Sequence, residues 1–282
     1  MKKWNIKSYA KINLCLRVLG KFKNNYHKIE SIISPINFYD EITIKQIKKK
    51  NHEVLFYGRF SRGIPKINTV TKILKIMDDN KILKNKKYLI KIKKKIPQKS
   101  GMGGGSMNAA SILQFFIFKS KIKLSHSKIL GICKKIGSDV ILGLNRKISI
   151  LKGDGKLILS NKKLKLYLLI LKPNFGCSTE LIYKNVKAYS KPKFTTISNK
   201  IISLSNISRL NNDLEDIAFK KFPILSKIKE SLLEQPNIVF SRMTGSGSSI
   251  VGYFISKKAS IYAAKKIKKK YKNCWCILSK TI

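Results

Sequence analysis

The chain has 282 residues, enough for one large domain or two modest ones. Hydrophobic residues make up 43%, as in ordinary globular proteins, so we expect a folded chain rather than a disordered one. No stretch reaches the roughly 18 consecutive apolar residues of a membrane span, and the first residues lack the apolar run of a secretory leader. These features predict a cytoplasmic protein.

Charge is the most unusual property of the sequence. The 60 Lys and Arg residues against 14 Asp and Glu give a net charge of +46, which raises the hypothesis of a nucleic-acid-binding protein. However, the lysines are spread along the whole chain, and Ile, Asn, Tyr and Phe, whose codons are also rich in A and T, are abundant with them. We therefore favour drift in an A/T-rich genome, with nonspecific binding of polyanions as its consequence. A basic RNA-binding protein is the alternative from a different class.

The cysteines favour free thiols over a metal site. They form an odd set without Cys-x-x-Cys spacing, consisting of Cys15, Cys133, Cys177, Cys274 and Cys276. A structural zinc site needs two closely spaced ligand pairs, which are missing here. We expect partly buried thiols in a reducing compartment.

The first half of the chain mixes strands and helices. In chain order, its patterns predict a strand over 4–19, a polar turn over 20–25, strands over 41–47 and 54–57, a helix over 67–83 and a strand over 88–96. Asn68 or Thr69 is the expected N-cap of the helix over 67–83. Further on, the patterns predict helices over 108–118 and 127–136 and strands over 148–151 and 156–158. The helix over 108–118 is apolar around most of its circumference, so we expect it to be central and buried.

A second region begins near residue 164. Its patterns predict strands over 166–171, 238–240, 250–254 and 275–277, and helices over 178–186, 225–233 and 259–270. Strands and helices that do not alternate regularly indicate an α+β fold. We expect two lobes with a boundary near residue 160, giving domains 1–160 and 161–282.

A glycine-rich loop, Gly101–Ser106, lies between a predicted strand and the helix over 108–118. Glycines let backbone N–H groups turn toward an anion, and the following helix adds free N–H groups and a positive dipole end. The loop is not a Walker A motif, because no Gly-Lys-Ser/Thr closes it, and Ser106 stands where a dinucleotide fingerprint has glycine. The alternative is a flexible turn whose glycines only permit packing. The pattern favours anion binding and goes no further.

The same loop carries a family resemblance. Pro97–Ala110 resembles the phosphate loop of the GHMP kinases, small-molecule kinases such as galactokinase, homoserine kinase and mevalonate kinase. Ala10–Leu14, followed by Gly20 and Tyr26-His27, is similar to the opening of one family among them, the 4-diphosphocytidyl-2-C-methyl-D-erythritol kinases.

Two further blocks extend the match, since Gly137–Val140 and Met243–Ser249 resemble segments of that family. The four blocks stand in the family's order and span residues 10 to 249. The resemblance implies a two-lobed GHMP kinase fold, with an N-terminal ATP-binding lobe and a C-terminal α/β sandwich lobe.

Three departures from the family pattern stand out. Lys99-Ser100 occupies a place where small residues or glycines are usual, Met107 replaces the second serine of a Ser-Ser pair, and Asn25 replaces the glycine before Tyr26. Met107 matters most, because a hydroxyl there would help to bind phosphate or metal. Ser106 is left for that role.

The resemblance assigns catalysis to Lys11 and Asp139. Asp139 is expected to accept the proton of the acceptor hydroxyl, late in the reaction because a carboxylate is a weak base. Lys11 is expected to lie beside Asp139, keep it ionised and stabilise developing charge. Without the resemblance, Lys11 would be read as a solvated lysine and Asp139 as a turn aspartate.

Ligand binding is likewise assigned by resemblance. ATP is expected to contact Pro97, Gln98, Lys99, Ser100, Gly101, Met102, Gly103, Gly104, Gly105, Ser106, Met107 and Asn108, with Asn68, Lys94 and Lys95 on the adenine and phosphate side. Mg²⁺ is expected with ATP, because it bridges the β- and γ-phosphates, without a dedicated carboxylate cage and with Ser106 as a candidate ligand.

The acceptor is expected to be a cytidine-diphosphate-linked polyol. Its binding residues by resemblance are Asn13, Tyr26, His27, Thr179, Tyr183, Gly245, Ser246 and Gly247. Tyr26 and Tyr183 would lie on either face of the cytosine and His27 at its polar edge, while Asn13 and Thr179 would bind the methylerythritol or its diphosphate.

The implied reaction is phosphorylation of the 2-hydroxyl of 4-diphosphocytidyl-2-C-methyl-D-erythritol in non-mevalonate isoprenoid synthesis. Another GHMP kinase is the alternative. We expect small-molecule partners, no specific nucleic acid, no membrane, and a monomer or homodimer.

Overall fold

The computed structural model describes residues 2–23, 25–119, 122–194 and 201–282. Its strands are β1 (Lys3–Lys21), β2 (His27–Ile47), β3 (Glu53–Tyr57), β4 (Lys87–Lys93), β5 (Ser149–Leu151), β6 (Leu157–Leu159), β7 (Tyr167–Lys172), β8 (Ile238–Met243), β9 (Ile250–Phe254) and β10 (Trp275–Lys280). Its helices are α1 (Thr69–Asp79), α2 (Gly104–Phe118), α3 (His126–Ile136), the 3₁₀ turn η1 (Ile141–Leu144), α4 (Thr179–Lys184), α5 (Leu204–Ser208), α6 (Glu215–Lys221), α7 (Ile224–Leu233) and α8 (Lys257–Lys270). This mixture of helices and sheets confirms the α+β class.

The chain folds into two compact units, each assembled from several segments. The first unit comprises Met1–Lys11, Phe38–Gln98 and Gly103–Asn145, and the second comprises Ile12–Asn37, Lys99–Met102 and Arg146–Ile282. Strands β1 and β2 each begin in one unit and end in the other, and the glycine loop is also divided between them. A domain boundary near residue 160 stays a prediction.

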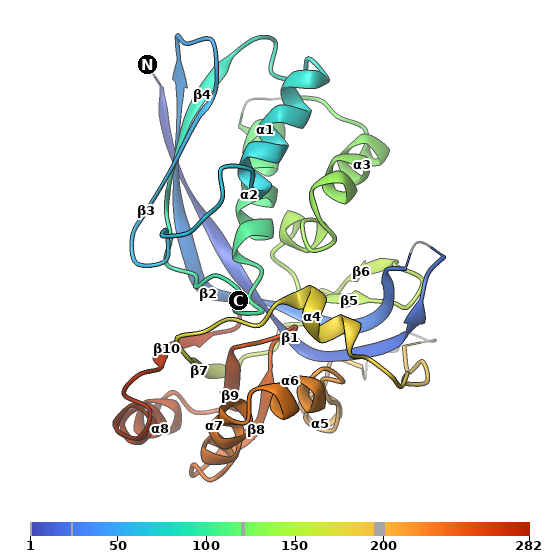
Figure 1. Ribbon diagram of the computed structural model, residues 1–282, viewed down its shortest axis with the longest axis vertical. Coiled ribbons are helices and arrows are strands. Elements are labelled where there is room, and N and C mark those ends of the chain that lie inside the picture. Colours follow the sequence, from blue (N-terminus) through green and yellow to red (C-terminus); the bar gives the residue numbers. More distant parts are fainter. Residues whose placement is uncertain (1, 24, 120–121, 195–200) are drawn as a thin grey trace. The chain divides into compact units, whose positions relative to one another are not determined.

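In the first unit, three helices cover one face of a sheet. Glu41–Ile47 of β2 pairs antiparallel with β4, which pairs parallel with β3. Figure 1 shows α1, α2 and α3 together on one side of these strands. Side chains alternate across the sheet, so Ile90 and Ile92 of β4 are buried while Lys91 between them is exposed. The apolar core lies between sheet and helices and includes Ile42, Ile44, Ile73, Leu74, Ile90, Ile92, Leu113 and Phe116.

Helix α1 begins as the sequence predicts. The Asn68 side chain accepts hydrogen bonds from the N–H groups of Val70 (3.0 Å) and Thr71 (3.2 Å), and the Thr71 hydroxyl accepts from the N–H of Asn68 (2.9 Å). This is a capping box, in which both ends of the first turn satisfy each other. The helix ends at Asp79, four residues before the predicted end, because Lys81 adopts a left-handed conformation with φ of +54°.

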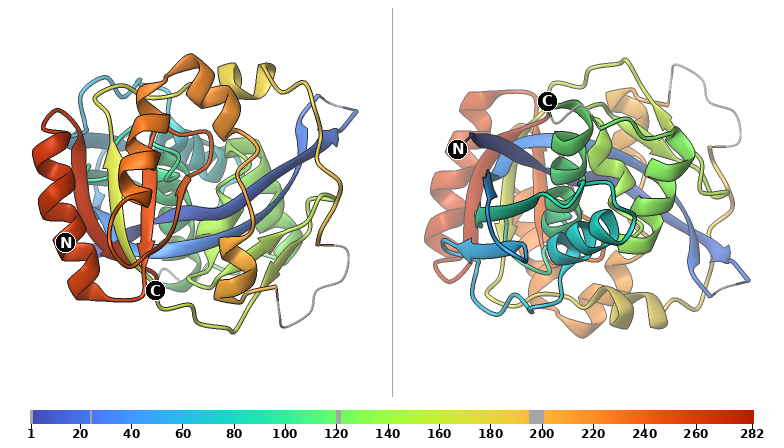
Figure 2. Two further views of the ribbon diagram at one scale, coloured as in Figure 1. Left: turned by 90° about the horizontal axis from the view of Figure 1, so that it is seen from below. Right: turned by 90° about the horizontal axis from the view of Figure 1, so that it is seen from above.

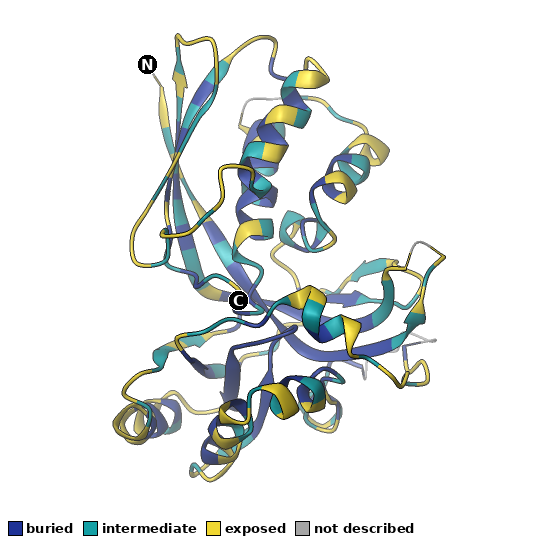
Figure 3. Ribbon diagram, in the orientation of Figure 1, coloured by how far each residue is buried: buried dark blue, intermediate teal, exposed yellow. Residues whose placement is uncertain are grey.

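The second unit contains a four-stranded antiparallel sheet with strand order β10-β7-β9-β8. Helix α7 packs on β8 and β9, and α8 packs on β7 and β10. Figure 2 (left) shows α8, in red, alongside this sheet, and Figure 3 shows strands β7, β8 and β9 as largely buried. The core includes Leu169, Leu171, Leu225, Ile228, Leu232, Ile250, Phe254, Ala263 and Ile267. The early part of β2 also lies in this unit, where Ser31–Ile33 pairs with β5, and β5 pairs with β6.

Three features of the fold differ from the sequence predictions. Strand β2 starts at His27, whereas the predicted strand starts at residue 41. The prediction missed the early part of the strand because residues 30–36 are all buried and show no alternation of apolar and polar residues. Helix α2 starts at Gly104 instead of Asn108, and the short helices α5 and α6 have no counterpart in the predictions. None of the helices that the structure describes is long and apolar enough to span a bilayer.

Candidate active site

The two predicted catalytic residues meet in the first unit. Lys11 lies on β1, and Asp139 lies in the turn between α3 and η1. The Nζ atom of Lys11 is 3.4 Å from Oδ2 of Asp139. The Lys11 side chain is 6% exposed and that of Asp139 is 39% exposed. A buried ammonium is thus paired with a carboxylate that a substrate hydroxyl can still reach.

The start of α2 lies against Lys11. A Cβ atom on Gly103 would lie 3.1 Å from Cε of Lys11, and Gly103 has a φ of +69°, so both space and backbone conformation favour glycine. The helix has no side-chain cap at Gly103 and no acidic residue in its first turn. Free N–H groups at a helix start attract anions. The first unit therefore brings a cation, a carboxylate and an anion-attracting helix end together.

A second cation lies at the same helix end. Lys94 is 4% exposed and forms an ion pair with Asp40, which is 0% exposed. A Cβ atom on Gly104 would lie 3.3 Å from Nζ of Lys94. Oδ1 of Asp40 also accepts hydrogen bonds from the backbone N–H groups of Lys95 (2.7 Å) and Ile96 (2.9 Å). Asp40 thus fixes the segment that leads into the glycine loop.

The side chain of Lys95, a predicted ATP residue, lies against residues of β2. Its ammonium pairs with Glu41 and lies 5.3 Å from the centre of the Tyr39 ring. The Asn68 side chain is engaged as well, because its amide donates to the carbonyl groups of Pro65 and Lys66 in addition to capping α1. ATP contacts by these two residues stay predictions, and for Asn68 they would have to be compatible with its capping role.

Met107, in the first turn of α2, is buried in the protein. It is 3% exposed, and its sulfur lies 3.0 Å from the place where Gly143 would carry a Cβ atom. Its N–H donates to the carbonyl of Gly103 within the helix. The next residue, Asn108, is 1% exposed, and its Oδ1 has no hydrogen-bond partner within the described part of the chain. A polar ligand group would satisfy this acceptor.

In the second unit, residues 99–101, at the entry to the glycine loop, pack directly against the second glycine turn, Thr244–Ser249. A Cβ atom on Gly101 would lie 1.9 Å from the carbonyl oxygen of Thr244, and the Thr244 hydroxyl donates to the Gly101 carbonyl (3.3 Å). The N–H groups of Ser248 and Ser249 donate to the carbonyls of Lys99 and Ser100, each at 3.3 Å. The two turns form one structure, a contact that no sequence motif predicted.

Four of the predicted substrate residues gather at this junction. The N–H of Asn13 donates to the Thr244 hydroxyl (2.9 Å), and its side-chain amide donates to the Ser31 hydroxyl (2.8 Å). A Cβ atom on Gly245 would lie 3.4 Å from Oδ1 of Asn13. The hydroxyls of Thr179 and Ser246 are 3.0 Å apart. Asn13, Thr179, Gly245 and Ser246 therefore belong to one polar cluster.

The aromatic residues form a separate group in the same unit. The rings of His27 and Tyr183 have centroids 4.9 Å apart and are tilted by 39°. Burial and then the charge of Lys21 lower the pKa of His27, so its imidazole is neutral at pH 7. Its Nε2 is buried without a hydrogen-bond partner among the residues described. Tyr26, next to His27 in the chain, is 69% exposed.

The cysteines are free, as predicted. Burial raises the pKa values of Cys15, Cys133 and Cys177 to about 11, so these thiols are protonated at neutral pH. A protonated thiol is a poor nucleophile and a poor metal ligand. Among the described residues, no three His, Cys, Asp or Glu side chains are grouped to bind a metal.

Comparison with known proteins agrees with this arrangement. The model of the GHMP kinases N terminal domain matches residues 68–149, and that of the GHMP kinases C terminal domain matches residues 196–273. The 4-diphosphocytidyl-2-C-methyl-D-erythritol kinase of Pelagibacter ubique is 51% identical over 282 residues, which is 100% of both chains. The enzyme of that name from Clostridium botulinum is 33% identical over 275 residues, covering 94% of this chain and 96% of its own.

Solved structures show the same fold. A crystal structure of 4-(cytidine 5'-diphospho)-2C-methyl-D-erythritol kinase matches with a TM-score of 0.78 at 20% identity, covering 99% of this chain and 100% of its own. Homoserine kinase from Cytophaga hutchinsonii matches with a TM-score of 0.73 at 15% identity, covering 100% and 95%. At these identities the likeness concerns the fold alone. Sequence and fold together show that the chain belongs to the GHMP kinases, in the family of the 4-diphosphocytidyl-2-C-methyl-D-erythritol kinases.

Proposed function

We propose that this chain transfers the γ-phosphoryl group of ATP to the 2-hydroxyl of 4-diphosphocytidyl-2-C-methyl-D-erythritol, giving the 2-phosphate and ADP. The step belongs to non-mevalonate isoprenoid precursor synthesis. The ion pair of Lys11 and Asp139 beside the start of α2 carries the proposal, because it joins a base, a cation and an anion-attracting helix end in one unit. The 51% identity to the Pelagibacter ubique enzyme supports this choice of substrate.

In this mechanism Asp139 receives the proton of the 2-hydroxyl as the new P–O bond forms. Its carboxylate is 39% exposed, so the hydroxyl can approach it, while the ammonium of Lys11 lies 3.4 Å from its Oδ2 atom. Lys11 also stabilises the negative charge that develops on the transferred group. Little covalent chemistry is required of the protein, since phosphoryl transfer depends on alignment and neutralisation of charge.

The phosphates of ATP are assigned to the first turn of α2. The absence of a capping side chain and of acidic residues in that turn fits an anion. Lys94, whose ammonium lies at Gly104, adds a cation there. Ser106 would be the protein ligand of Mg²⁺ bound with ATP, and the ion would neutralise part of the phosphate charge.

The cytidyl substrate is assigned to the second unit. His27 has a buried nitrogen without a partner among the described residues, which a group on the edge of cytosine would satisfy, and Tyr183 lies next to it. The polar cluster of Asn13, Thr179 and Gly245 is assigned to the methylerythritol diphosphate. Tyr26, largely exposed, is proposed to cover the base from solvent.

The wider setting is also a proposal. We place the protein in the cytoplasm as a monomer or homodimer, with small-molecule partners and no specific nucleic acid. The high positive charge then acts only through weak, salt-sensitive binding of polyanions.

A substrate panel tests the proposal. The purified chain is incubated with ATP, Mg²⁺ and either the cytidyl substrate, homoserine or mevalonate, and the products are identified by mass spectrometry. We expect phosphorylation of the cytidyl substrate alone. Turnover of another acceptor would move the chain to a different GHMP activity. No turnover together with tight RNA binding would favour the RNA-binding alternative.

A further inference from the structure

We propose that Asn212 is a positioning residue that holds the second glycine turn in its substrate-binding shape. Asn212 lies between α5 and α6, far in sequence from that turn, and none of the family motifs noted above includes it. The proposal rests on the proposed function, because it assigns the turn to the cytidyl substrate. It concerns the shape of the turn and no direct contact of Asn212 with a ligand.

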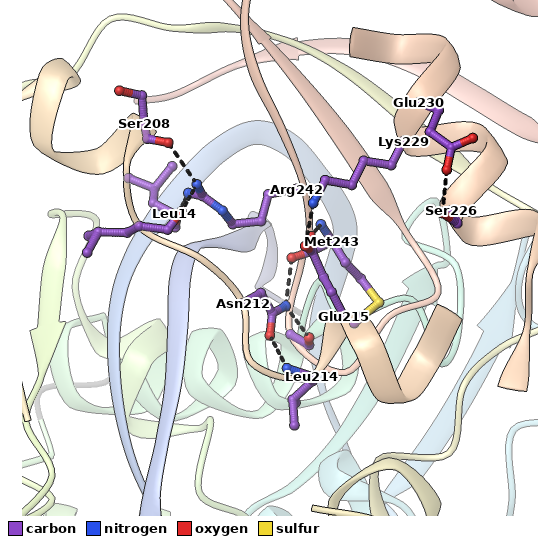
Figure 4. A network of polar contacts seen from close by, with 12 residues as sticks. Leu14, Ser208, Asn212, Leu214, Glu215, Ser226, Lys229, Glu230, Arg242 and Met243 are labelled. Carbon is purple, nitrogen blue, oxygen red and sulfur yellow. Dashed lines mark hydrogen bonds and ion pairs between the residues drawn. The ribbon is translucent and has the colours of Figure 1, made fainter. Parts of the chain in front are cut away.

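The amide of Asn212 spans Thr244. Asn212 is 3% exposed, and its Nδ2 donates to the carbonyl oxygens of Met243 and Gly245, each at 2.8 Å. Its Oδ1 accepts from the N–H of Leu214 at 3.1 Å (Figure 4). Both donor hydrogens of the amide are therefore committed to the carbonyls on either side of Thr244.

Thr244 is the residue through which the turn contacts its neighbours. Its hydroxyl accepts from the N–H of Asn13 and donates to the carbonyl of Gly101. Gly245, next in the chain, has a φ of +56° and lies close to both Gly101 and Asn13. If the carbonyls beside Thr244 were released, the link to Asn13 and the link to the first glycine loop would both loosen.

Asn212 itself is anchored to the strand that carries Asn13. The N–H of Leu16 donates to the carbonyl of Asn211 (3.0 Å), and the N–H of Asp213 donates to the carbonyl of Leu16 (2.9 Å). Oδ2 of Asp213 also accepts from the N–H of Val18 at 2.8 Å. The backbone of Asn212 is thus fixed to β1 while its side chain is fixed to the turn, so Asn212 sets the turn relative to Asn13.

The neighbouring polar contacts act on the end of β8 and stop before the turn. Arg242 donates to backbone carbonyls that include those of Leu14 and Ser208, and Glu215 accepts from the N–H of Met243 (2.6 Å) while pairing with Lys229 (2.6 Å) (Figure 4). These contacts are made at Arg242 and Met243 of β8, so they stabilise the second unit independently of the conformation of the turn. The amide of Asn212, in contrast, donates to the carbonyl of Gly245 within the turn.

The test uses Asn212→Asp, which keeps the shape and the Oδ1 acceptor but places an oxygen against two carbonyl oxygens. The variant loses both buried donor hydrogens to the carbonyls of Met243 and Gly245, so the turn is no longer held in shape. We expect the KM for the cytidyl substrate to rise about tenfold or more. We expect the KM for ATP to rise less than that for the cytidyl substrate, because the phosphates are assigned to the first turn of α2, whereas Thr244 contacts Gly101 at the start of the glycine loop. Asn206→Asp is the matched control, because the Asn206 amide donates to the carbonyl of Ile201 (2.9 Å) in the same unit and does not reach the turn.

Hydrogen exchange supplies a readout that does not depend on the substrate. In folded Asn212→Asp we expect faster exchange at residues 243–249 and at the N–H of Asn13, with α7 and α8 unchanged. Asn212→Ser, which keeps one donor, should show a smaller effect in both measurements. Equal rises in both KM values, faster exchange throughout the second unit, or loss of folding in both variants would overturn the positioning role. If the wild type does not phosphorylate the cytidyl substrate, the proposed function fails, while the exchange result still decides whether Asn212 holds the turn.

Discussion

The buried pair of Asp40 and Lys94 allows a worked prediction of stability. In Asp40→Asn the side chain keeps one oxygen for the N–H groups of Lys95 and Ile96, but the ammonium of Lys94, 4% exposed, loses its counter-charge. Removing one partner of a buried ion pair costs roughly 3–5 kcal/mol, because an uncompensated charge stays behind. We expect Asp40→Asn to lower the free energy of unfolding of the first unit by about 3 kcal/mol.

The double variant Asp40→Asn/Lys94→Met separates charge from packing. It removes both charges, so it should recover part of the loss and be more stable than Asp40→Asn alone. Unfolding in urea is followed by the fluorescence of Trp4, which packs on Phe115 in the first unit, in a Trp275→Phe background that silences the second tryptophan.

The control for this series is Glu41→Gln, which breaks the half-exposed pair with Lys95 and should cost less than about 1 kcal/mol. A free energy of unfolding for Asp40→Asn within about 1 kcal/mol of the wild-type value would be typical of an exposed pair and would contradict a buried, uncompensated charge on Lys94. A lower free energy of unfolding for the double variant than for Asp40→Asn would contradict it as well.

Three further predictions follow from local geometry. Gly101→Ala should abolish activity and fold poorly, whereas Gly63→Ala, which shares a positive φ but has nothing within 4 Å of its Cβ position, should cost only about 1–2 kcal/mol, as thermal unfolding and turnover will show. Met107→Ser restores the family's hydroxyl but empties a buried site, so it should lower stability in urea by about 3 kcal/mol without raising kcat. Burial raises the pKa of Asp78, but hydrogen bonds from Lys87 and a neighbouring histidine lower it more, so its net pKa is depressed. The stabilisation by Asp78 is present above its ordinary pKa of about 4 and is lost as the pH falls through the lower pKa of the folded state. The free energy of unfolding of Asp78→Asn should therefore fall less steeply with decreasing pH than that of the wild type.

Local rules in the sequence predicted much of the first unit. The alternation of Ile and Lys in β4 gave its buried face, and Asn68 before an apolar stripe gave the capped start of α1. The start of α2 escaped prediction, because Gly104 and Gly105 have low helix propensity and only the left-handed Gly103 turns the chain into the helix.

Contacts between distant segments could not be predicted in the same way. The packing of Gly101 on Thr244 joins positions 143 residues apart, and no local pattern in a single sequence reports such a pairing. Asn212 was missed for a similar reason, since the Asn-Asn-Asp stretch over 211–213 looks like any polar turn. For the candidate site, the residues came from motifs, while the meeting of Lys11 with Asp139 required the fold.

Turnover of Asp139→Ala decides whether this carboxylate is the base of the proposed phosphoryl transfer. The chain is assayed with ATP, Mg²⁺ and the cytidyl substrate, beside Lys11→Ala and the control Asp79→Ala, which removes an exposed carboxylate from the end of α1 in the same unit. We expect Asp139→Ala to lower kcat by about a hundredfold or more, Lys11→Ala also to lower it strongly, and the control to leave it unchanged. A folded Asp139→Ala protein with near-wild-type kcat would show that Asp139 is not the base.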